Sequence, residues 1–314
     1  MAAYVVGSRG SALARAQVRG YLRAVRERVP AAEFTRRVIV ESGDRDRLTV
    51  MSRSAAGGSG FSSEQEAALA RGEVDVVVHS LKDLPTANPP GLTLLPPPGR
   101  EDVHDALCGA TLASLRKGAR VGTGAPRRAA QLRAVRPDLD VVPIRGNVPP
   151  RLRMLETHGL DAVVLAAAGL RRLGLEHAIG ELLPLDRFPP SPGQGALGIQ
   201  VRTDAASAPL RAVLATTADP AADAAVRAER SLLAALHGGC NVPVAAHATL
   251  LPTGTLTLSA QITSLDGTTQ LTATRTTPTP TTTPESLGTT LATDLIAQGA
   301  HTILAAARAD LGAG

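Results

Sequence analysis

The sequence predicts an α/β protein with two similar lobes around a cleft, followed by a small α+β domain. Short β-branched runs alternate with helical patterns over most of the 314 residues, which favours sheets covered by helices. The stretch ARGEVD at 70–75 resembles THGLD at 157–161, and each precedes a run containing valines, which indicates a duplication. Near the C-terminus, alternating strands flank the turn residues Asp266-Gly267. The domains are expected at 1–97 with 197–215 (first lobe), 100–192 (second lobe) and 218–314 (α+β domain).

The first lobe begins with the pattern of a strand, a glycine loop and a helix. Residues 4–6 read as a short strand, and apolar residues recur at helical spacing between 14 and 29. Ser11 is a natural N-cap, which would aim backbone N–H groups and the positive end of the helix dipole at the loop that carries Arg9. This layout is typical of anion sites, and a capped tight turn is the alternative.

A long stretch without periodicity follows in the first lobe. Residues 45–63 include Gly57, Gly58 and Gly60 and show no helical or strand pattern, so we expect a mobile lid. The other elements expected in this lobe are a strand at 34–40, a turn at 41–44, a helix at 63–70 and a strand at 92–95.

The valine run at 76–78 predicts the central strand of the first lobe. The run is β-branched and too short for a helix, so we expect a strand buried on both faces. Four polar residues crowd its carboxyl end, which is where open α/β sheets bind ligands: His79, Ser80, Lys82 and Asp83. A solvated Lys-Asp pair is the alternative. Only Lys82 and Lys117 among the 33 basic residues are lysines, which favours a specific role for Lys82.

The second lobe brings arginines to the ends of its strands. Strands are expected near 120–121, 141–144 and 162–165, with helices between them. Arginine forks bind carboxylates and phosphates bidentately, so several at corresponding strand ends favour an anion site over scattered surface charges. The arginines concerned are Arg127, Arg128, Arg145, Arg151 and Arg172.

The remaining segments form the return to the first lobe and the last domain. After Gly193-Gln194-Gly195, residues 196–201 are expected to cross back as a strand. The Thr/Pro tract at 276–284 is expected to be a disordered loop. The other expected elements are helices at 221–236, 287–296 and 302–311 and strands at 256–262 and 271–277.

Composition narrows the class of partner. The net charge of +5 and the pI near 10.0 favour an anionic partner, but two Tyr, three Phe and no Trp leave little to stack on nucleic acid bases. A small polycarboxylate or phosphate fits better. Two distant cysteines and the lack of a long apolar run or a signal-like start predict a cytoplasmic protein without a membrane partner. The seven histidines show no metal-binding spacing.

An ordered set of motifs resembles the porphobilinogen deaminase (hydroxymethylbilane synthase) family over essentially the whole chain. Any one motif would be weak evidence, but the ordered set is specific. The motifs are SRGSALA at 8–14 with Gln17, residues 75–85, Arg127-Arg128, RGNV at 145–148 with Arg151-Leu152, GQGA at 193–196, and GGC at 238–240 with Val242-Pro243.

The resemblance implies two lobes like those of type II periplasmic binding proteins and a third domain that carries a dipyrromethane cofactor on a cysteine. It implies a monomeric enzyme that condenses four porphobilinogens, releases ammonia and hydrolyses off the linear tetrapyrrole. It assigns catalysis to Asp83 and Lys82, cofactor binding to Cys240, Ser80, Lys82, Asp83, Thr123, Arg127, Arg128 and Gly146, and substrate binding to Arg9, Ser11, Phe61, Arg145, Arg151, Arg172 and Gln194, with no metal.

The implied chemistry suits these residue types. Loss of ammonia from porphobilinogen leaves an azafulvenium cation, which the Asp83 carboxylate would stabilise. Each pyrrole carries an acetate and a propionate, so chain growth accumulates negative charge that arginines would neutralise. A thiolate is a good nucleophile, which suits the role of anchor for Cys240.

Several positions depart from the family pattern. Ala55 and Ser59 replace lysines, Ser42 replaces an arginine, residues 124–126 (Gly-Ala-Pro) replace Ser-Ser-Leu, and 149–150 (Pro-Pro) replace Gly-Thr. Two alternatives therefore stay open beside a working deaminase. One is a weakened paralogue that binds a pyrrole or another polycarboxylate without full elongation, and the other is a two-lobed anion carrier without a covalent cofactor.

Overall fold

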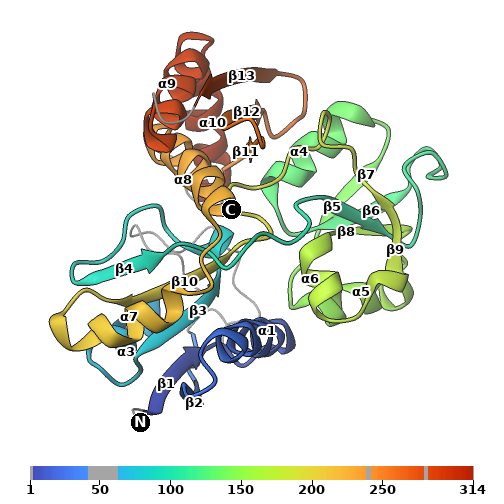
Figure 1. The fold of residues 1–314 in the computed structure, drawn as a ribbon. Helices are drawn as coiled ribbons and strands as arrows, with labels where there is room; N and C mark the ends of the chain where they lie inside the picture. The colour runs from blue at the N-terminus through green and yellow to red at the C-terminus, as the bar shows by residue number, and fades with distance from the viewer. Residues whose placement is uncertain (1–2, 42–62, 238–241, 279–281, 314) are drawn as a thin grey trace. The chain divides into compact units, whose positions relative to one another are not determined.

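The computed structural model describes residues 3–41, 63–237, 242–278 and 282–313 (Figure 1). The contacts divide the chain into two compact units. Unit 1 comprises Met1–Glu101 with Gly195–Asp223, and unit 2 comprises Asp102–Gln194 with Ala224–Gly314. The finer division of the chain into three domains at the expected boundaries remains a prediction.

Unit 1 contains a five-stranded sheet in the order β2-β1-β3-β10-β4. Its strands are β1 (Ala3–Ser8), β2 (Glu33–Val38), β3 (Val76–Ser80), β4 (Leu92–Leu95) and β10 (Leu197–Arg202). β1, β2 and β3 are parallel, whereas β10 runs antiparallel to β3 and β4, between which it lies (Figure 1). The expectation that the chain returns to the first lobe after Gly195 is therefore confirmed.

β3 begins with three consecutive valines because helices cover both faces of the sheet. Val76 and Val78 pack in one core with Val18 and Leu22 of α1 (Ala12–Arg28). Val77 lies on the other face, in a core that includes residues of α3 (Ser63–Ala70). A strand covered on both sides has no polar side, which explains the unbroken β-branched run and confirms the expectation of a strand buried on both faces.

Unit 2 contains a second five-stranded sheet with the same arrangement, in the order β7-β6-β8-β5-β9. Its strands are β5 (Asp105–Cys108), β6 (Arg120–Thr123), β7 (Asp140–Pro143), β8 (Ala162–Ala166) and β9 (Ile179–Leu182). Again the first three strands are parallel and the fourth, β5, is antiparallel to both of its neighbours. The two sheets thus have the arrangement expected of the lobes of a type II periplasmic binding protein.

The duplication seen in the sequence also appears in the hydrogen bonds. The Asp75 carboxylate accepts the backbone N–H of Val5 at 2.8 Å, and the Asp161 carboxylate accepts that of Arg120 at 2.7 Å. Each aspartate closes the bridge by donating its own N–H to the same residue, at 2.8 and 2.9 Å. The two motifs therefore fix equivalent neighbouring strands in the two sheets.

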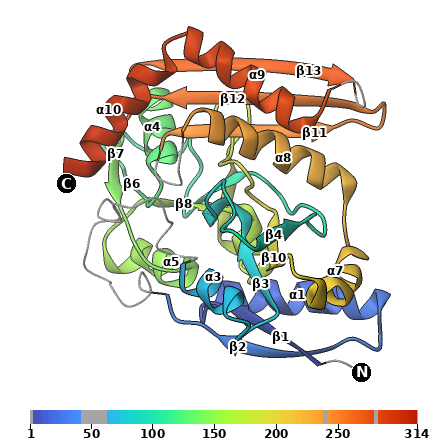
Figure 2. The same ribbon diagram turned by 90° about the vertical axis from the view of Figure 1, so that its left-hand side faces the viewer.

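The C-terminal part of unit 2 is an antiparallel sheet with helices beside it (Figure 2). Its elements are β11 (Val244–Leu250), β12 (Thr255–Thr263), β13 (Gln270–Pro278), α8 (Pro220–Ala235), α9 (Pro284–Ala297) and α10 (Ala300–Ala313). β13 extends through Pro278, and Thr283 caps α9 by accepting the N–H of Ser286. The expected disordered loop at 276–284 is therefore wrong at both of its ends, whereas 279–281 lie outside the described residues.

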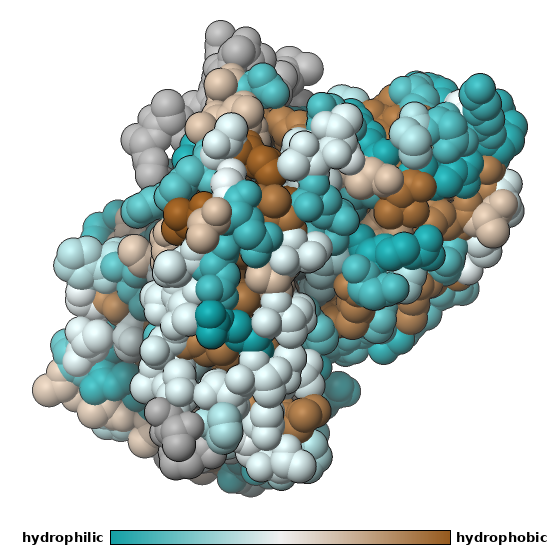
Figure 3. Space-filling model, turned by 90° about the horizontal axis from the view of Figure 1, so that it is seen from above, coloured by the Kyte–Doolittle hydropathy of each residue, from teal (hydrophilic) through white to brown (hydrophobic). Residues whose placement is uncertain are grey.

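Short helices complete the two units. They are α4 (Pro126–Val135), α5 (Val148–Thr157) and α6 (Ala167–Arg172) in unit 2, α7 (Ala208–Ala215) in unit 1, and 3₁₀ turns at Leu81–Asp83, Glu176–Ala178 and Ala205–Ser207. On the face drawn in Figure 3, hydrophobic residues form small patches separated by polar ones. Among the helices that the structure describes, none has the length and apolarity needed to cross a membrane.

Candidate active site

The first group of predicted site residues lies at one edge of the unit 1 sheet. β1 and β3 are parallel neighbours, so their carboxyl ends meet at the same edge. Arg9 follows β1, and Lys82 and Asp83 follow β3. The structure thus places Arg9, Lys82 and Asp83 at the same sheet edge, whereas their roles remain a prediction.

Lys82 and Asp83 lie on a 3₁₀ turn that two leucines hold in the core. Leu81 and Leu84 are each 4% exposed, whereas Lys82 and Asp83 are partly exposed. The Leu81 N–H donates to the Ala196 carbonyl at 3.1 Å, which ties the turn to the start of β10. The turn packs closely on β10, because a Cβ on Gly198 would lie 2.8 Å from Leu84 Cδ1. The backbone under the two charged side chains is thus fixed on both sides.

Two polar residues connect α1 to this edge. Ser11 caps α1 by accepting the N–H of Ala14 at 3.2 Å, as its sequence position predicts. Gln17, six residues later on α1, is 4% exposed and donates from Nε2 to Ser80 Oγ at 2.8 Å. The hydroxyl of Ser80 therefore has a fixed partner at the end of β3.

His79 is a buried structural residue, which differs from the expectation that it belongs to the ligand edge. It is 6% exposed, and its Nε2 lies 3.2 Å from Gln200 Oε1. Burial lowers the pKa of His79 to about 4, although the hydrogen bond to Gln200 opposes this effect and the charge of Arg9 adds to it. The imidazole is therefore neutral near pH 7.

Glu41 is a second buried group near Arg9 that the sequence did not reveal. Its carboxylate accepts the N–H groups of Glu64 at 3.2 Å and Gln65 at 3.0 Å, and so caps the start of α3. Burial raises the pKa of Glu41 above its ordinary value, while these hydrogen bonds and the charge of Arg9 oppose the rise.

In unit 2, Arg127 and Arg128 converge on a buried carboxylate, that of Asp105. Asp105 is 0% exposed, with Oδ2 at 2.7 Å from Arg127 Nη1 and Oδ1 at 2.8 Å from Arg128 Nη2. Burial alone would raise the pKa of Asp105, but the two guanidinium groups outweigh it and hold the pKa well below its usual range. Two arginines around one carboxylate give these three side chains a net charge of +1.

Gln194 belongs to the same buried cluster. It is 0% exposed, and its Nε2 donates to Asp105 Oδ1 at 2.8 Å and to the Val103 carbonyl at 2.7 Å. Its Oε1 lies 3.4 Å from Arg128 Nη2. The predicted cofactor residues Arg127 and Arg128 and the predicted substrate residue Gln194 are thus brought together, around an aspartate that the sequence did not single out.

The loops after β6 and β7 bring further predicted residues together. Thr123 ends β6 and is 3% exposed, and its Oγ1 accepts the N–H of Ala125 at 3.3 Å. Arg151 Nη2 lies 3.1 Å from where a Cβ on Gly124 would be. Gly146 has φ of +105°, which glycine adopts without strain. Arg172 lies elsewhere, at the last residue of α6.

Gly124 is required by the close approach of two backbone segments. A Cβ at this position would lie 2.6 Å from the Ile144 carbonyl oxygen, which cannot move away as a flexible side chain would. Gly124→Ser, which restores the family residue, should therefore overpack the loop by about 1–3 kcal/mol and lower the Tm by about 2–10 °C. Thermal unfolding checks this, with Gly20→Ser as the control because a Cβ there meets no atom within 4 Å. An unchanged Tm for Gly124→Ser would contradict the packing argument.

Several predicted residues lie outside the described part of the chain, namely Cys240, Phe61, Ser42, Ala55 and Ser59. The same holds for the lid expected at 45–63 except for its last residue, Ser63, which begins α3.

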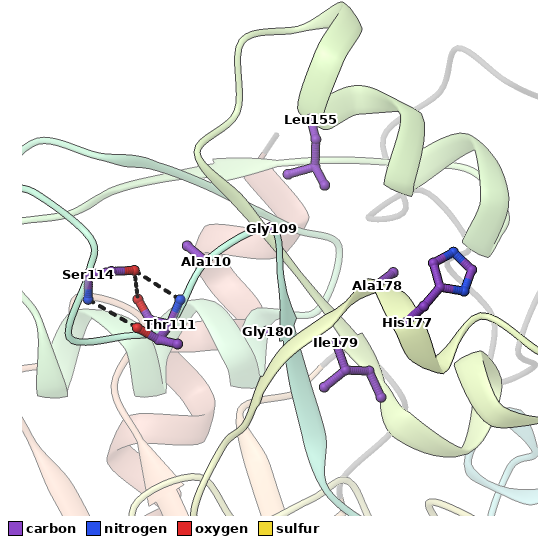
Figure 4. A pocket seen from close by; sticks show the side chains of 9 residues that line it. All are labelled: Gly109, Ala110, Thr111, Ser114, Leu155, His177, Ala178, Ile179 and Gly180. Atoms are coloured by element: carbon purple, nitrogen blue, oxygen red, sulfur yellow. Dashed lines mark hydrogen bonds between the residues drawn. The ribbon is translucent and has the colours of Figure 1, made fainter.

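Unit 2 also contains an open pocket of about 540 Å³ (Figure 4). Its lining includes Leu155, Ile179, Thr111, Ser114 and His177, and none of the predicted site residues. The pocket lies where β5 ends, beside the amino end of β8, because Cys108 pairs with Val163. It is therefore at the sheet edge opposite the arginine cluster, which consists of Arg127 and Arg128 around Asp105 at the start of β5.

Two family models match the chain. One, described as "Porphobilinogen deaminase, dipyromethane cofactor binding domain", matches residues 4–209, and the other, "Porphobilinogen deaminase, C-terminal domain", matches residues 224–297. The porphobilinogen deaminase of Geobacter sulfurreducens is 44% identical over 303 residues, covering 96% of this chain and 93% of that protein. That of Deinococcus deserti is 41% identical over 316 residues, covering 98% and 100%. Among solved structures, the methionine binding protein MetQ is 13% identical with a TM-score of 0.44, covering 68% of this chain and 89% of that one.

Proposed function

The chain belongs to the porphobilinogen deaminase family, and from this premise we propose that it is a hydroxymethylbilane synthase. This transferase joins four porphobilinogen molecules, with loss of ammonia, and releases the linear tetrapyrrole from which porphyrins and haem are made. The observation that carries the proposal is the match of both family models, which together span nearly the whole chain. The charged turn after β3 and the cationic cluster of unit 2 support it.

Asp83 and Lys82 are proposed as the catalytic pair. The substrate becomes an electrophilic cation when ammonia leaves, and a preorganised carboxylate stabilises that charge better than water does. Asp83 suits this role because its turn is anchored at Leu81 and Leu84 while its own side chain stays accessible. Lys82 is a compact cation beside it that can bind a carboxylate of the substrate.

The residues of unit 2 fit a dipyrromethane cofactor, which supplies the pyrrole position to which the growing chain is joined. A dipyrromethane carries four carboxylates, and the donors here are cationic or polar. Arg145 Nη2 is buried without a hydrogen-bond partner among the described residues. α4 and α5 both begin without an acidic residue in the first turn and without a side-chain cap, which leaves the positive end of each helix dipole facing no anionic side chain of its own first turn, although Pro126, Pro149 and Pro150 supply no N–H groups. Thr123, Arg127, Arg128 and Gly146 are proposed to hold the cofactor, together with Ser80, Lys82 and Asp83.

The substrate residues are proposed from the same chemistry. Arg9, Ser11, Arg145, Arg151, Arg172 and Gln194, with Phe61, are assigned to the substrate and growing chain. The argument is strongest for Arg145, whose guanidinium group is incompletely paired, and for Arg9, which lies at the edge that holds Asp83. We further propose that the enzyme acts as a cytoplasmic monomer without a nucleic acid or membrane partner, which sedimentation of the purified protein at working concentrations and co-purification tests would check.

Cys240 is proposed as the cofactor anchor, and intact mass tests this proposal. Purified protein should carry an added mass equal to two linked pyrroles, and Cys240→Ser should carry none, because the anchoring thiolate is lost. Cys108→Ala is the matched control and should keep the addition. Cys108 is fully buried, and burial raises its pKa to about 11, so its thiol stays protonated and unreactive. Wild-type protein that stays unmodified after incubation with porphobilinogen would overturn the proposed function.

A further inference from the structure

Two buried glutamine side chains, hydrogen-bonded to each other, connect Arg127 to the C-terminal sheet of β11, β12 and β13. Gln131 of α4 is 0% exposed, and its Oε1 accepts from Arg127 Nη1 at 2.8 Å. Its Nε2 donates to the Pro189 carbonyl at 3.0 Å and to Gln261 Oε1 at 2.9 Å. Gln261 lies in β12 and is 3% exposed. Every polar atom of the Gln131 side chain therefore has a partner.

Arg127 determines which atom donates and which accepts in each hydrogen bond that links Gln131 and Gln261 to it. A guanidinium group has only donors, so Gln131 must present Oε1 to it. The Nε2 of Gln131 then faces two acceptors, the Pro189 carbonyl and Gln261. Gln261 must in turn present its Oε1, because two amide nitrogens facing each other could not pair. An amide at either position can thus adopt only one orientation, which restricts the position of Arg127.

Arg127 Nη1 is held by three acceptors at once. Asp105 Oδ2 lies at 2.7 Å, Gln131 Oε1 at 2.8 Å and the Pro189 carbonyl at 2.9 Å. Asp105 supplies the charge, whereas Gln131 and Pro189 set the direction in which the guanidinium plane lies. The two amides lie on segments 130 residues apart in sequence, so only the folded contact between α4 and β12 brings them together.

We propose that Gln131 and Gln261 are positioning residues for the cofactor. They would fix the guanidinium group of Arg127 in the orientation in which it meets the cofactor. The proposal rests on the proposed function. It predicts that losing either amide slows the attachment and ordering of the cofactor without removing its anchor or its charge partners.

Arg133 provides a matched control on the same helix. Its Nη1 donates to the Leu265 carbonyl at 2.7 Å, and so joins α4 to the same C-terminal domain without contacting Arg127. Arg133→Gln should therefore weaken the docking of the domain but leave Arg127 in place. Gln131→Leu and Gln261→Leu each remove one amide from the chain that reaches Arg127.

The test uses the full chain made in cells that cannot synthesise porphobilinogen. The protein is incubated with porphobilinogen, the fraction that gains the cofactor mass is followed over time, and kcat, KM and the urea midpoint are measured for each variant. Gln131→Leu and Gln261→Leu should each slow the mass gain about 10-fold. The double variant should be no slower than the slower single variant, because both changes break one chain of hydrogen bonds. Arg133→Gln should gain the mass within about twofold of wild type.

Two outcomes would overturn the positioning role. In the first, both Gln variants gain the cofactor mass at the wild-type rate. In the second, Arg133→Gln gains it as slowly as the Gln variants do, which would mean that the two amides act only by docking the C-terminal domain. If one Gln variant showed no cooperative unfolding in urea, and so had not folded, the other Gln variant would still decide between these outcomes. A wild-type chain that never gains the mass would instead contradict the proposed function, so the two failures are distinguishable.

Discussion

Replacing Asp83 by Asn should reduce turnover about 100- to 1000-fold while the fold persists. The amide has nearly the shape of the carboxylate but no negative charge to face the cation that forms when ammonia leaves. The turn should survive, because Leu81 and Leu84, not Asp83, hold it in the core of unit 1. The rate of tetrapyrrole formation from porphobilinogen measures the loss, and circular dichroism checks the fold.

Asp186→Asn is the control for this change. Asp186 is an exposed aspartate of unit 2 whose carboxylate accepts only the N–H of its neighbour, Arg187, among the bonds of the described chain. Its loss should leave turnover unchanged. If Asp83→Asn worked within a few-fold of wild type, Asp83 would not be the group that stabilises the developing charge.

Much of the fold could be predicted where one physical signal dominated. β3 begins with three consecutive valines because both faces of its sheet are covered by helices. α1 shows a clear helical period and a serine cap. β5 and β9 were missed because DALC and IGEL contain one β-branched residue between them, Ile179, so neither segment has the composition of a strand. β11 was missed because its alanines have low β-propensity, so that only its pairing with β12 makes it a strand.

The candidate site could be predicted only as far as local motifs reach. Arg127 and Arg128 stand out in the sequence, but not the fact that both are buried, because their partner Asp105 lies more than twenty residues away. The one local signal for Asp105 is a charged residue that opens an apolar run, in DALC at 105–108. Gln131 and Gln261 show no local signal at all. Polar residues of this kind are recognisable only once the fold brings them together.

Removing the Asp105 carboxylate should have the largest effect on stability of any single substitution considered. Asp105→Ala leaves two buried guanidinium groups without their counterion, which typically costs about 3–5 kcal/mol. Gln194 would also lose an acceptor at 2.8 Å. The urea midpoint measures the loss. The matched control is Asp138→Ala, which removes the partly exposed partner of Arg136 at 2.8 Å and should cost far less of the midpoint than Asp105→Ala.

The stabilising effect of Asp105 should also depend on pH in one direction. Its pKa is lower in the folded protein than in the unfolded chain, where an aspartate has a pKa of about 3.9. The ionised Asp105 therefore contributes its full amount to the free energy of unfolding at pH values above that unfolded pKa. This contribution declines as the pH falls below it. Wild type should lose more stability than Asp105→Ala between about pH 5 and 3. Parallel pH profiles for the two proteins would mean that Asp105 is not held ionised by Arg127 and Arg128.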